Sequence, residues 1–275
     1  MSAPTIRLND GNTIPQIGFG TSPLNDREVV PAILAALEAG YRHIDTAYRY
    51  NNEKGVGQGI RESGIAREDL FVTTKLDGVF QGDDRAIGGL EESLRRLGME
   101  YVDLLLIHWP LPQRDQYVST WKTFETLLAA GKTRSIGLSN FKPSHIERLL
   151  AETSVRPAVN QIQLNPRITR PDQRAYDSEQ GIVTEAWSPL GAGNDLLRER
   201  ALVSIAGKYG KTPAQVVLRW HIELGVVAIP RSANPRRIAE NIDIFDFSLT
   251  DDEIALISAL DTGEEPRVDS DGSGH

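Results

Sequence analysis

The fold is decided by residues 70–108, where the run Leu70-Phe71-Val72-Thr73-Thr74-Lys75 precedes an amphipathic stretch, Asp84 to Leu97, then Gly98 and the apolar run Val102 to His108. Two short apolar runs around a longer amphipathic stretch are typical of a strand, a helix and a second strand, and a crossover of this length joins parallel strands. Gly98 stands where a helix commonly ends in a left-handed residue. The stretch therefore predicts two parallel strands connected by a helix.

The same unit recurs along the rest of the chain. The expected strands span residues 17–20, 43–45, 70–75, 102–108, 133–139, 158–163, 182–187 and 226–230. The expected helices span residues 27–39, 52–63, 84–97, 117–130, 143–152, 171–179 and 200–209, and a further basic helix follows Pro230. Eight such units with continuously apolar strands predict an α/β fold, a closed (β/α)8 TIM barrel, with an open doubly wound sheet as the alternative.

The two ends of the chain differ from this pattern. Thr5 to Leu8 and Thr13 to Pro15 flank the turn sequence Asn9-Asp10-Gly11-Asn12, which predicts an N-terminal β-hairpin that plugs or edges the barrel. No shift in composition marks a linker, so residues 1–275 are expected to form a single domain. The polar, glycine-containing stretch Glu264 to His275 is expected to be a loose tail.

Composition limits the partners and the chemistry. The formal net charge is −8 and Lys and Arg form no run, which argues against binding to nucleic acid. Cysteine is absent, which excludes disulfides, thiolate zinc sites and cysteine nucleophiles. The N-terminus has no basic segment followed by an apolar one, and no run approaches the roughly 18 apolar residues of a membrane span. We therefore expect a cytoplasmic protein with no membrane partner.

Three neighbouring strands finish in ionisable side chains, namely Asp45, Lys75 and His108. The C-terminal ends of parallel strands form one rim of a barrel, so these side chains should lie together, with Tyr50 just beyond the first of them. A buried lysine and a buried aspartate each need a counter-charge, so we expect Lys75 and Asp45 to pair. That pair alone is compatible with a structural salt bridge. A phenol and an imidazole on the same rim favour an active site.

A set of short motifs extends along nearly the whole chain. They are Leu8-Asn9-Asp10-Gly11-Asn12, Gly40 to Thr46, Asn52-Glu53, Ile107-His108-Trp109-Pro110, Ile136 to Phe141, Asn160-Gln161, Lys211 to Gln215 and Glu240-Asn241. Each motif alone is weak, but together they are very specific. With them, the chain closely resembles the aldo-keto reductase superfamily, especially the bacterial branch that includes the 2,5-diketo-D-gluconate reductases.

The resemblance implies an oxidoreductase that uses NADPH to reduce small aldehydes or ketones to alcohols, with diketo sugar acids as one candidate class. It implies the catalytic tetrad Asp45, Tyr50, Lys75 and His108. Hydride addition to a carbonyl leaves an alkoxide, and a phenol whose pKa is lowered by a nearby ammonium can protonate it. Tyr50 would be that general acid and His108 would orient the carbonyl oxygen. Tyr48 lies two residues earlier, and only the family's spacing selects Tyr50.

The Rossmann fingerprint G-x-G-x-x-G is absent, and we interpret the differently spaced Gly55-Val56-Gly57-Gln58-Gly59 as packing glycines inside a helix. A barrel can instead hold phosphate at the loops after its last two strands, here residues 187–191 and 230–237. The resemblance implies NADPH contacts from Ser139, Asn140 and Gln161 (carboxamide), Trp187 (nicotinamide stacking), Ser188 and Leu190 (pyrophosphate), Arg231, Ser232 and Arg237 (2′-phosphate), and Glu240 and Asn241 (adenine).

This chain also departs from the family pattern. Relatives usually carry Lys where Arg231 stands, and the nearest branch usually carries a cation in place of Asn234, so the grip on the 2′-phosphate is expected to be altered. Relatives often have an aromatic residue where this chain has Asp77, in the loop that ends at Gly82. We therefore expect Asp77 and Trp109 to influence substrate choice. The resemblance implies a monomer, and the residue inventory predicts no metal.

Two other classes of protein are compatible with a barrel. Barrel hydrolases use metal clusters or paired carboxylates on the same rim, but no His-x-His ends the first strand here and Glu185 has no second carboxylate on its strand. We interpret Glu185 as a residue of the barrel interior. The other class is an NADPH-binding barrel that acts as a sensor or regulatory subunit with little turnover.

Overall fold

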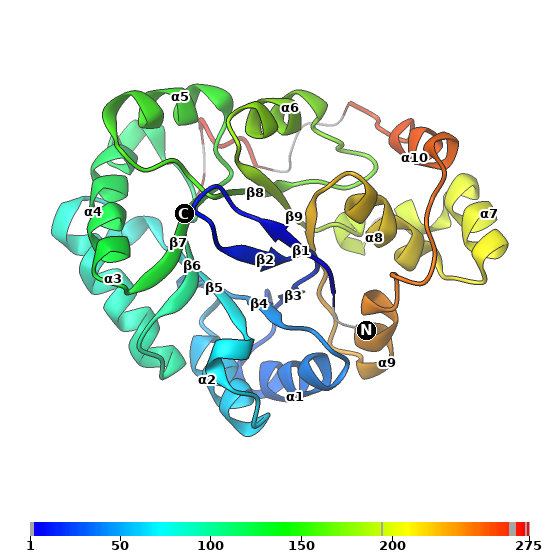
Figure 1. Cartoon of the computed structure of the whole chain (residues 1–275), viewed down its shortest axis with the longest axis horizontal. Coiled ribbons are helices and arrows are strands. Elements are labelled where there is room, and N and C mark those ends of the chain that lie inside the picture. Colours follow the sequence, from blue (N-terminus) through cyan, green and yellow to red (C-terminus); the bar gives the residue numbers. More distant parts are fainter. Residues whose placement is uncertain (1–2, 194, 264–267, 273, 275) are drawn as a thin grey trace.

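Eight parallel strands form the wall of a barrel that is viewed along its axis in Figure 1. The computed structural model describes residues 3–193, 195–263, 268–272 and 274. Around the barrel the strands are β3 (Phe19–Gly20), β4 (His43–Asp45), β5 (Phe71–Leu76), β6 (Val102–Ile107), β7 (Thr133–Ser139), β8 (Val159–Gln163), β9 (Val183–Trp187) and β10 (Val227–Ile229). A parallel bridge between Ile17 and Ala228 closes the ring beside β3 and β10. The expected (β/α)8 fold is confirmed.

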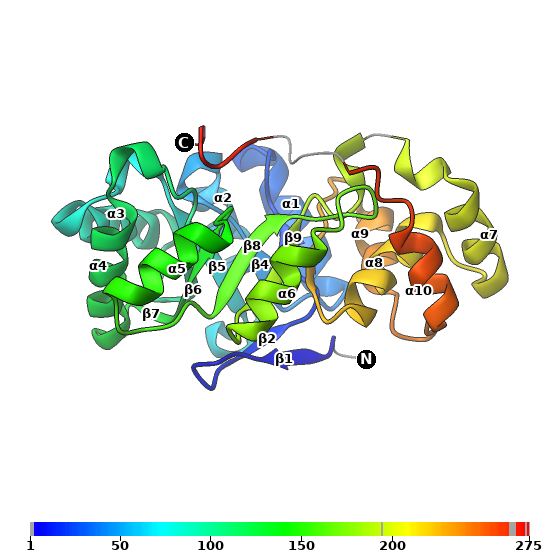
Figure 2. The same ribbon diagram turned by 90° about the horizontal axis from the view of Figure 1, so that it is seen from above.

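Helices surround the barrel wall (Figures 1 and 2). They are α1 (Asp26–Glu38), α2 (Glu53–Glu62), α3 (Asp83–Leu97), α4 (Tyr117–Ala129), α5 (Pro143–Glu152), α6 (Pro171–Glu179), α7 (Arg200–Tyr209), α8 (Pro213–Glu223), α9 (Pro235–Ile242) and α10 (Asp251–Ser258). The seven helices expected between residues 27 and 209 agree with these bounds to within one residue, and α5, α6 and α7 agree at both ends. The barrel wall is thereby shielded from solvent, which continuously apolar parallel strands require.

Helices α8 and α10 are not among the expected ones. The buried side chains of α8 include the adjacent pairs Val216-Val217 and Trp220-His221, so its apolar residues do not follow one helical stripe. Helix α10 has 8 residues, of which Ile257 is buried, and so short a stretch has little periodicity to detect. Their first residues do carry a signal, because Thr212 and Thr250 each form a capping box with the third residue of the helix.

The hairpin of β1 (Thr5–Arg7) and β2 (Thr13–Pro15) covers one end of the barrel, as predicted (Figures 1 and 2). Its Ile14 is fully buried in the cluster of apolar side chains inside that end. The Asn9 side-chain amide donates to the Pro157 carbonyl oxygen at 2.7 Å, which fixes the turn against the barrel. The C-terminal ends of the strands therefore form the accessible rim on the other side.

The glycines of α2 allow close packing between helices, as the sequence indicates. A Cβ atom at Gly57 would lie 2.0 Å from the Leu97 carbonyl oxygen at the end of α3. One at Gly55 would lie 2.6 Å from a methyl carbon of Val29 in α1. Because neither close approach leaves room for a side chain on α2, this helix fits between its two neighbours only with glycine at these positions.

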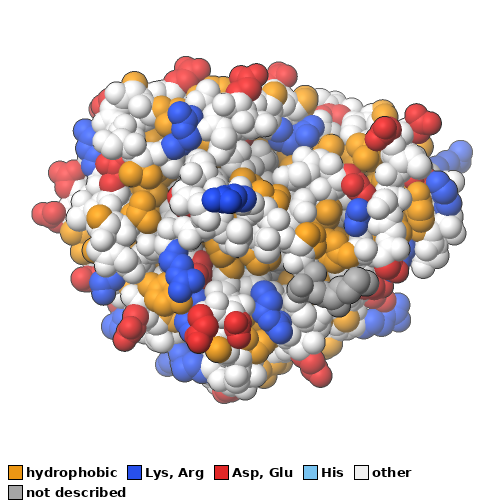
Figure 3. All heavy atoms as spheres, in the orientation of Figure 1, with side chains coloured by type: hydrophobic (Ala, Val, Ile, Leu, Met, Phe, Trp, Pro, Cys, Tyr) orange, Lys and Arg blue, Asp and Glu red, His pale blue; other side chains and the backbone are white. Residues whose placement is uncertain are grey.

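The surface carries charges of both signs. Figure 3, which views the hairpin side, shows Lys and Arg side chains interspersed with Asp and Glu and no broad field of one sign. Among the helices that the structure describes, none combines the length and the apolar composition needed to span a bilayer.

Candidate active site

The site is built around a buried ion pair between β4 and β5. Their register places Asp45 opposite Thr73, so Lys75, two residues further, points to the same side of the sheet as Thr73. The Lys75 ammonium nitrogen lies 2.7 and 2.8 Å from the two carboxylate oxygens of Asp45. It also donates to the Thr46 carbonyl oxygen at 3.0 Å. Lys75 is fully buried and Asp45 nearly so, and each therefore supplies the counter-charge that the other needs.

The Lys75 ammonium also contacts the Tyr50 hydroxyl, at 3.2 Å. Tyr50 ends the short 3-10 helix Tyr48–Tyr50 that follows β4. An ammonium can only donate, so the phenol oxygen accepts from it and the phenol proton remains available for another acceptor. The His108 ring lies edge-on to the Tyr50 ring, with ring centroids 5.7 Å apart. The four residues expected on the rim are thus side by side.

Tyr48 points in a different direction from Tyr50. Its ring packs edge-on against Phe80 with centroids 4.9 Å apart, and the Arg96 guanidinium lies 4.0 Å from its centroid. Phe80 follows β5 and Arg96 belongs to α3, so the Tyr48 ring lies against the helical layer. The structure thereby separates the two tyrosines, which residue spacing alone does not.

Burial and neighbouring charges shift the pKa values of Tyr50 and Lys75 in opposite directions. Burial raises the pKa of Tyr50, and the nearby Lys75 ammonium lowers it by less, so the pKa lies above its usual value. The sequence-based expectation of a lowered pKa neglected this loss of solvent. Burial lowers the pKa of Lys75, but Asp45 and Tyr50 raise it by more. Both groups therefore carry their protons at neutral pH.

Polar side chains from the ends of β7, β8 and β9 lie next to this group. Asn140, with a φ of 65°, donates its amide to the His108 carbonyl oxygen and to the Ser139 hydroxyl, both at 3.0 Å. The Asn140 amide oxygen accepts from the Trp187 indole nitrogen at 2.9 Å. The Ser139 hydroxyl donates to the Gln161 carbonyl oxygen at 3.0 Å. Four residues predicted to contact a nicotinamide ring thus form one network.

Gln161 connects that network to the ion pair. Its side-chain nitrogen lies 2.8 Å from an Asp45 carboxylate oxygen and 2.6 Å from a Glu185 carboxyl oxygen. Glu185 is fully buried in the barrel interior, as the sequence interpretation has it. No residue pattern in the sequence indicates its contact with Gln161, because the contact depends on the register of β8 with β9.

The loops after β9 and β10 contain the other residues predicted to bind cofactor. Ser188 and Leu190 are partly buried just after Trp187, and Ser188 has a φ of 52°. After β10, Ser232 is buried and its hydroxyl oxygen accepts from the Asn234 backbone nitrogen at 3.0 Å. In α9, Asn241 is buried, while Glu240 pairs with Arg236 at 2.7 Å.

Two cationic side chains extend into solvent at the start of α9. Arg231 and Arg237 are exposed, and within the described part of the chain neither guanidinium has an ion pair. The Asn234 side-chain oxygen accepts from the Arg237 backbone nitrogen at 3.3 Å and so caps the helix. Unpaired guanidinium groups at a helix N-terminus favour an anion.

The two residues expected to influence substrate choice are both buried. Trp109 follows His108 directly, and its carbonyl oxygen accepts from the Gln81 side chain at 2.6 Å. Asp77 caps the 3-10 helix Gly78–Phe80 by accepting from the Val79 backbone nitrogen at 3.0 Å. Asp77 therefore shapes the loop after β5, and contact of either residue with a substrate stays a prediction.

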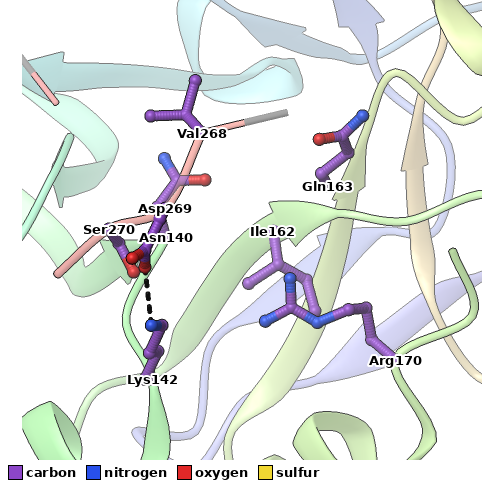
Figure 4. Close-up of a pocket in the computed structure, with 8 residues that line it drawn as sticks. All are labelled: Asn140, Lys142, Ile162, Gln163, Arg170, Val268, Asp269 and Ser270. Atoms are coloured by element: carbon purple, nitrogen blue, oxygen red, sulfur yellow. Dashed lines mark hydrogen bonds and ion pairs between the residues drawn. The ribbon is translucent and has the colours of Figure 1, made fainter. Parts of the chain in front are cut away.

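A pocket of about 350 Å³ lies beside this network (Figure 4). It is lined by Asn140, Lys142, Ile162, Gln163, Arg170, Val268, Asp269 and Ser270. Lys142 pairs with Asp269 at 2.6 Å and with Asp271 at 2.5 Å, and His145 lies 2.9 Å from Asp271. Of the expected tail, residues 264–267, 273 and 275 lie outside the described part. Residues 268–272 lie against the rim.

Within the described ranges, no group of three or more His, Asp or Glu side chains is arranged to hold a metal ion. The ionisable residues at the rim are instead arranged as one ion pair, one phenol and one imidazole. This arrangement suits proton transfer to or from a small polar molecule at the rim.

Comparison with known proteins identifies the class of this barrel. Residues 16–262 match the Aldo/keto reductase family. An aldo-keto reductase of Mycolicibacterium smegmatis is 50% identical over 264 residues, covering 95% of both chains. A methylglyoxal reductase of Salmonella typhimurium is 46% identical over 278 residues, covering 100% of both. The crystal structure of a Bombyx mori aldo-keto reductase in complex with NADP is 40% identical, with a TM-score of 0.90, covering 96% of this chain and 95% of that one. The chain belongs to the aldo/keto reductase family.

Proposed function

We propose that the protein reduces small aldehydes or ketones to alcohols with NADPH, and that Tyr50 is the proton donor. The observation that carries this proposal is the contact between the Lys75 ammonium and the Tyr50 hydroxyl, beside a Lys75–Asp45 ion pair. The family assignment and the NADP complex of the silkworm relative support the cofactor. The name of the Salmonella relative makes methylglyoxal a candidate substrate, next to diketo sugar acids.

Each residue of the tetrad then has a distinct task. NADPH, when bound, supplies the hydride that reduces a carbonyl carbon. Tyr50 donates its proton to the oxygen, and Lys75 stabilises the phenolate that this step leaves behind. Asp45 holds the Lys75 ammonium in place through both carboxylate oxygens. His108, edge-on to Tyr50, is positioned to hydrogen-bond the same carbonyl oxygen.

The residues around the rim fit NADPH in two separate regions. Ser139, Asn140 and Gln161 offer polar groups next to Trp187, whose indole is fixed by Asn140 and suits stacking on a flat ring. In the second region, Arg231 and Arg237 have no ion pair with any residue that the structure describes, and their guanidinium groups would bind a phosphate. An anionic cofactor can therefore bind a chain with a net charge of −8.

A panel of carbonyl compounds tests the proposal. NADPH absorbance is followed with methylglyoxal, diketo sugar acids and aromatic aldehydes. Turnover of at least one class supports a reductase. A protein that binds NADPH and oxidises it once in the presence of an aldehyde, but does not turn over, would instead be a sensor or regulatory subunit.

Arg237→Ala is expected to weaken NADPH binding by about ten- to a hundredfold and to leave NADH binding nearly unchanged. The two cofactors differ by the 2′-phosphate, which a guanidinium can meet with paired, charge-assisted hydrogen bonds. Arg237 is exposed and within the described residues has no ion pair, so its charge is available for that contact. Dissociation constants from tryptophan fluorescence provide the measurement.

The matched control is Arg7→Ala, which removes an exposed guanidinium from the hairpin at the opposite end of the barrel. It should change neither dissociation constant. Equal losses for NADPH and NADH in Arg237→Ala would mean that Arg237 only supports the fold. Because Asn234 caps α9 and adds no cation, we expect the wild-type preference for NADPH to be modest.

Exhaustive treatment with a chelator is expected to leave carbonyl reduction unchanged. The tasks assigned above use a phenol, an ammonium and an imidazole, and none requires a Lewis acid. Activity is measured before and after chelation and dialysis. Loss of activity that a divalent ion restores would contradict the proposed mechanism and favour a metal-dependent reaction.

A further inference from the structure

One buried carboxyl group has no task in the proposed mechanism. Glu185 faces the barrel interior from β9, directly opposite Gln161 in the register with β8. One of its carboxyl oxygens lies 2.6 Å from the Gln161 side-chain nitrogen. The other is buried and has no hydrogen-bond partner among the residues that the structure describes. Burying a carboxyl group without full hydrogen bonding lowers the stability of the fold. A carboxyl group buried next to the tetrad despite this cost therefore suggests a role in the site.

The neighbours of Gln161 determine how its amide is oriented. The amide nitrogen carries two hydrogens, and it has two acceptors, one oxygen of Asp45 and one of Glu185. The reverse orientation would place the amide oxygen against two carboxyl groups, which cannot both donate. The Gln161 oxygen accepts no hydrogen bond from the described part of the chain, so it remains available to a donor at the rim.

We propose that Glu185 is a positioning residue of this site. It holds the Gln161 amide with the nitrogen toward the barrel interior, so that the oxygen is presented to a ligand that donates N–H bonds, such as the primary amide of nicotinamide. This inference rests on the proposed function, because it takes the ligand to be NADPH. Through Gln161 the same carboxyl group is also coupled to Asp45 and hence to Lys75.

The charges around Glu185 make this coupling dependent on pH. The ionisable groups that face it are Asp45 from β4, Lys75 from β5 and Tyr50 from the 3-10 helix. Its register neighbours Gln161 and Val227 carry no charge. The Lys75 ammonium is paired with Asp45, and its charge also acts on Glu185 without a direct contact.

Burial and the Asp45 charge raise the pKa of Glu185 to about 8, so it is largely protonated at neutral pH. Above that pH it gains a negative charge, which raises the pKa of Tyr50 further and makes the phenol a weaker acid. Carbonyl reduction by the wild type should therefore decline above about pH 8.

Two substitutions separate the two roles. Glu185→Gln keeps the size and an oxygen acceptor for Gln161 but cannot ionise, so the decline above pH 8 should be lost. Glu185→Leu removes one of the two acceptors of the Gln161 amide and leaves only Asp45, so the amide is held less firmly and the NADPH dissociation constant should rise by about two- to tenfold. Binding is measured by tryptophan fluorescence and the pH profile by NADPH absorbance, after thermal unfolding has shown that each variant is folded.

Asp177→Asn is the control, because Asp177 is also a buried carboxyl group and bonds Asn160 on β8, away from the tetrad. It should retain the decline above pH 8. If Glu185→Gln retains the decline, the titrating role is overturned. If Glu185→Leu leaves the dissociation constant unchanged, the positioning of Gln161 is overturned, even if the variant unfolds at a lower temperature. Wild-type protein that binds no NADPH would overturn the proposed function itself, and the ligand assigned to Gln161 with it.

Discussion

Tyr50→Phe is expected to lower carbonyl reduction by about 10²- to 10⁴-fold while NADPH still binds. The substitution removes the hydroxyl that contacts the Lys75 ammonium and leaves the ring in place beside His108. Without the phenol, no group at that position can protonate the alkoxide. Steady-state NADPH oxidation gives the loss of activity, and fluorescence titration shows whether the cofactor site is intact.

Tyr48→Phe is the matched control for this variant. Its ring contacts with Phe80 and Arg96 do not involve the hydroxyl, so the loop should keep its shape. We expect activity within about threefold of the wild type, because the substitution leaves the packing of the ring intact. If Tyr48→Phe is inactive and Tyr50→Phe is active, the assignment of the general acid is wrong.

Lys75→Met is expected to reduce both activity and stability. It leaves the Asp45 carboxylate buried without its counter-charge, and removing one member of a buried pair lowers the free energy of unfolding by about 3–5 kcal/mol. It also removes the ammonium that stabilises the Tyr50 phenolate, so activity should fall by at least about a hundredfold. Urea denaturation measures the first effect and steady-state kinetics the second.

The double variant Lys75→Met, Asp45→Asn separates the two consequences. Neutralising the carboxylate removes the unpaired charge, so most of the lost stability should return while activity stays low. A double variant as unstable as Lys75→Met would show that packing of the lysine, and not charge, is the cause. Recovery of activity in the double variant would contradict the role given to Lys75.

The barrel was predictable because its strands are short, apolar and separated by stretches with helical periodicity. The turn sequence that begins at Asn9 predicts the hairpin itself. Its position across one end of the barrel depends on tertiary contacts, such as the hydrogen bond from Asn9 to Pro157, which a local sequence pattern does not specify. Helix α8 was missed because it is buried on more than one side and lacks the stripe that marks a surface helix. Periodicity detects a helix only where one of its faces meets solvent.

The site was predictable to the extent that it depends on strand ends. Asp45 and Lys75 finish neighbouring strands, and a parallel sheet brings such residues together whatever the details of packing. The direction of the Tyr48 and Tyr50 rings depends on a single 3-10 turn, which no residue pattern specifies. The link from Gln161 to Glu185 needs the register of two strands far along the barrel, and the raised pKa of Tyr50 needs the extent of burial.

The placement of the two chain termini determines which end of the protein is suited to an affinity tag, a fusion partner or a surface linker. Strand β1 near the N-terminus belongs to the hairpin at one end of the barrel (Figure 2). A Cβ atom at Gly274, in contrast, would lie 3.0 Å from the side chain of Trp109, the residue after His108. An affinity tag, a fluorescent fusion or a surface linker added at the N-terminus therefore extends away from the rim. The same addition at the C-terminus would begin beside the catalytic residues. Immobilised preparations should accordingly be anchored through the hairpin end.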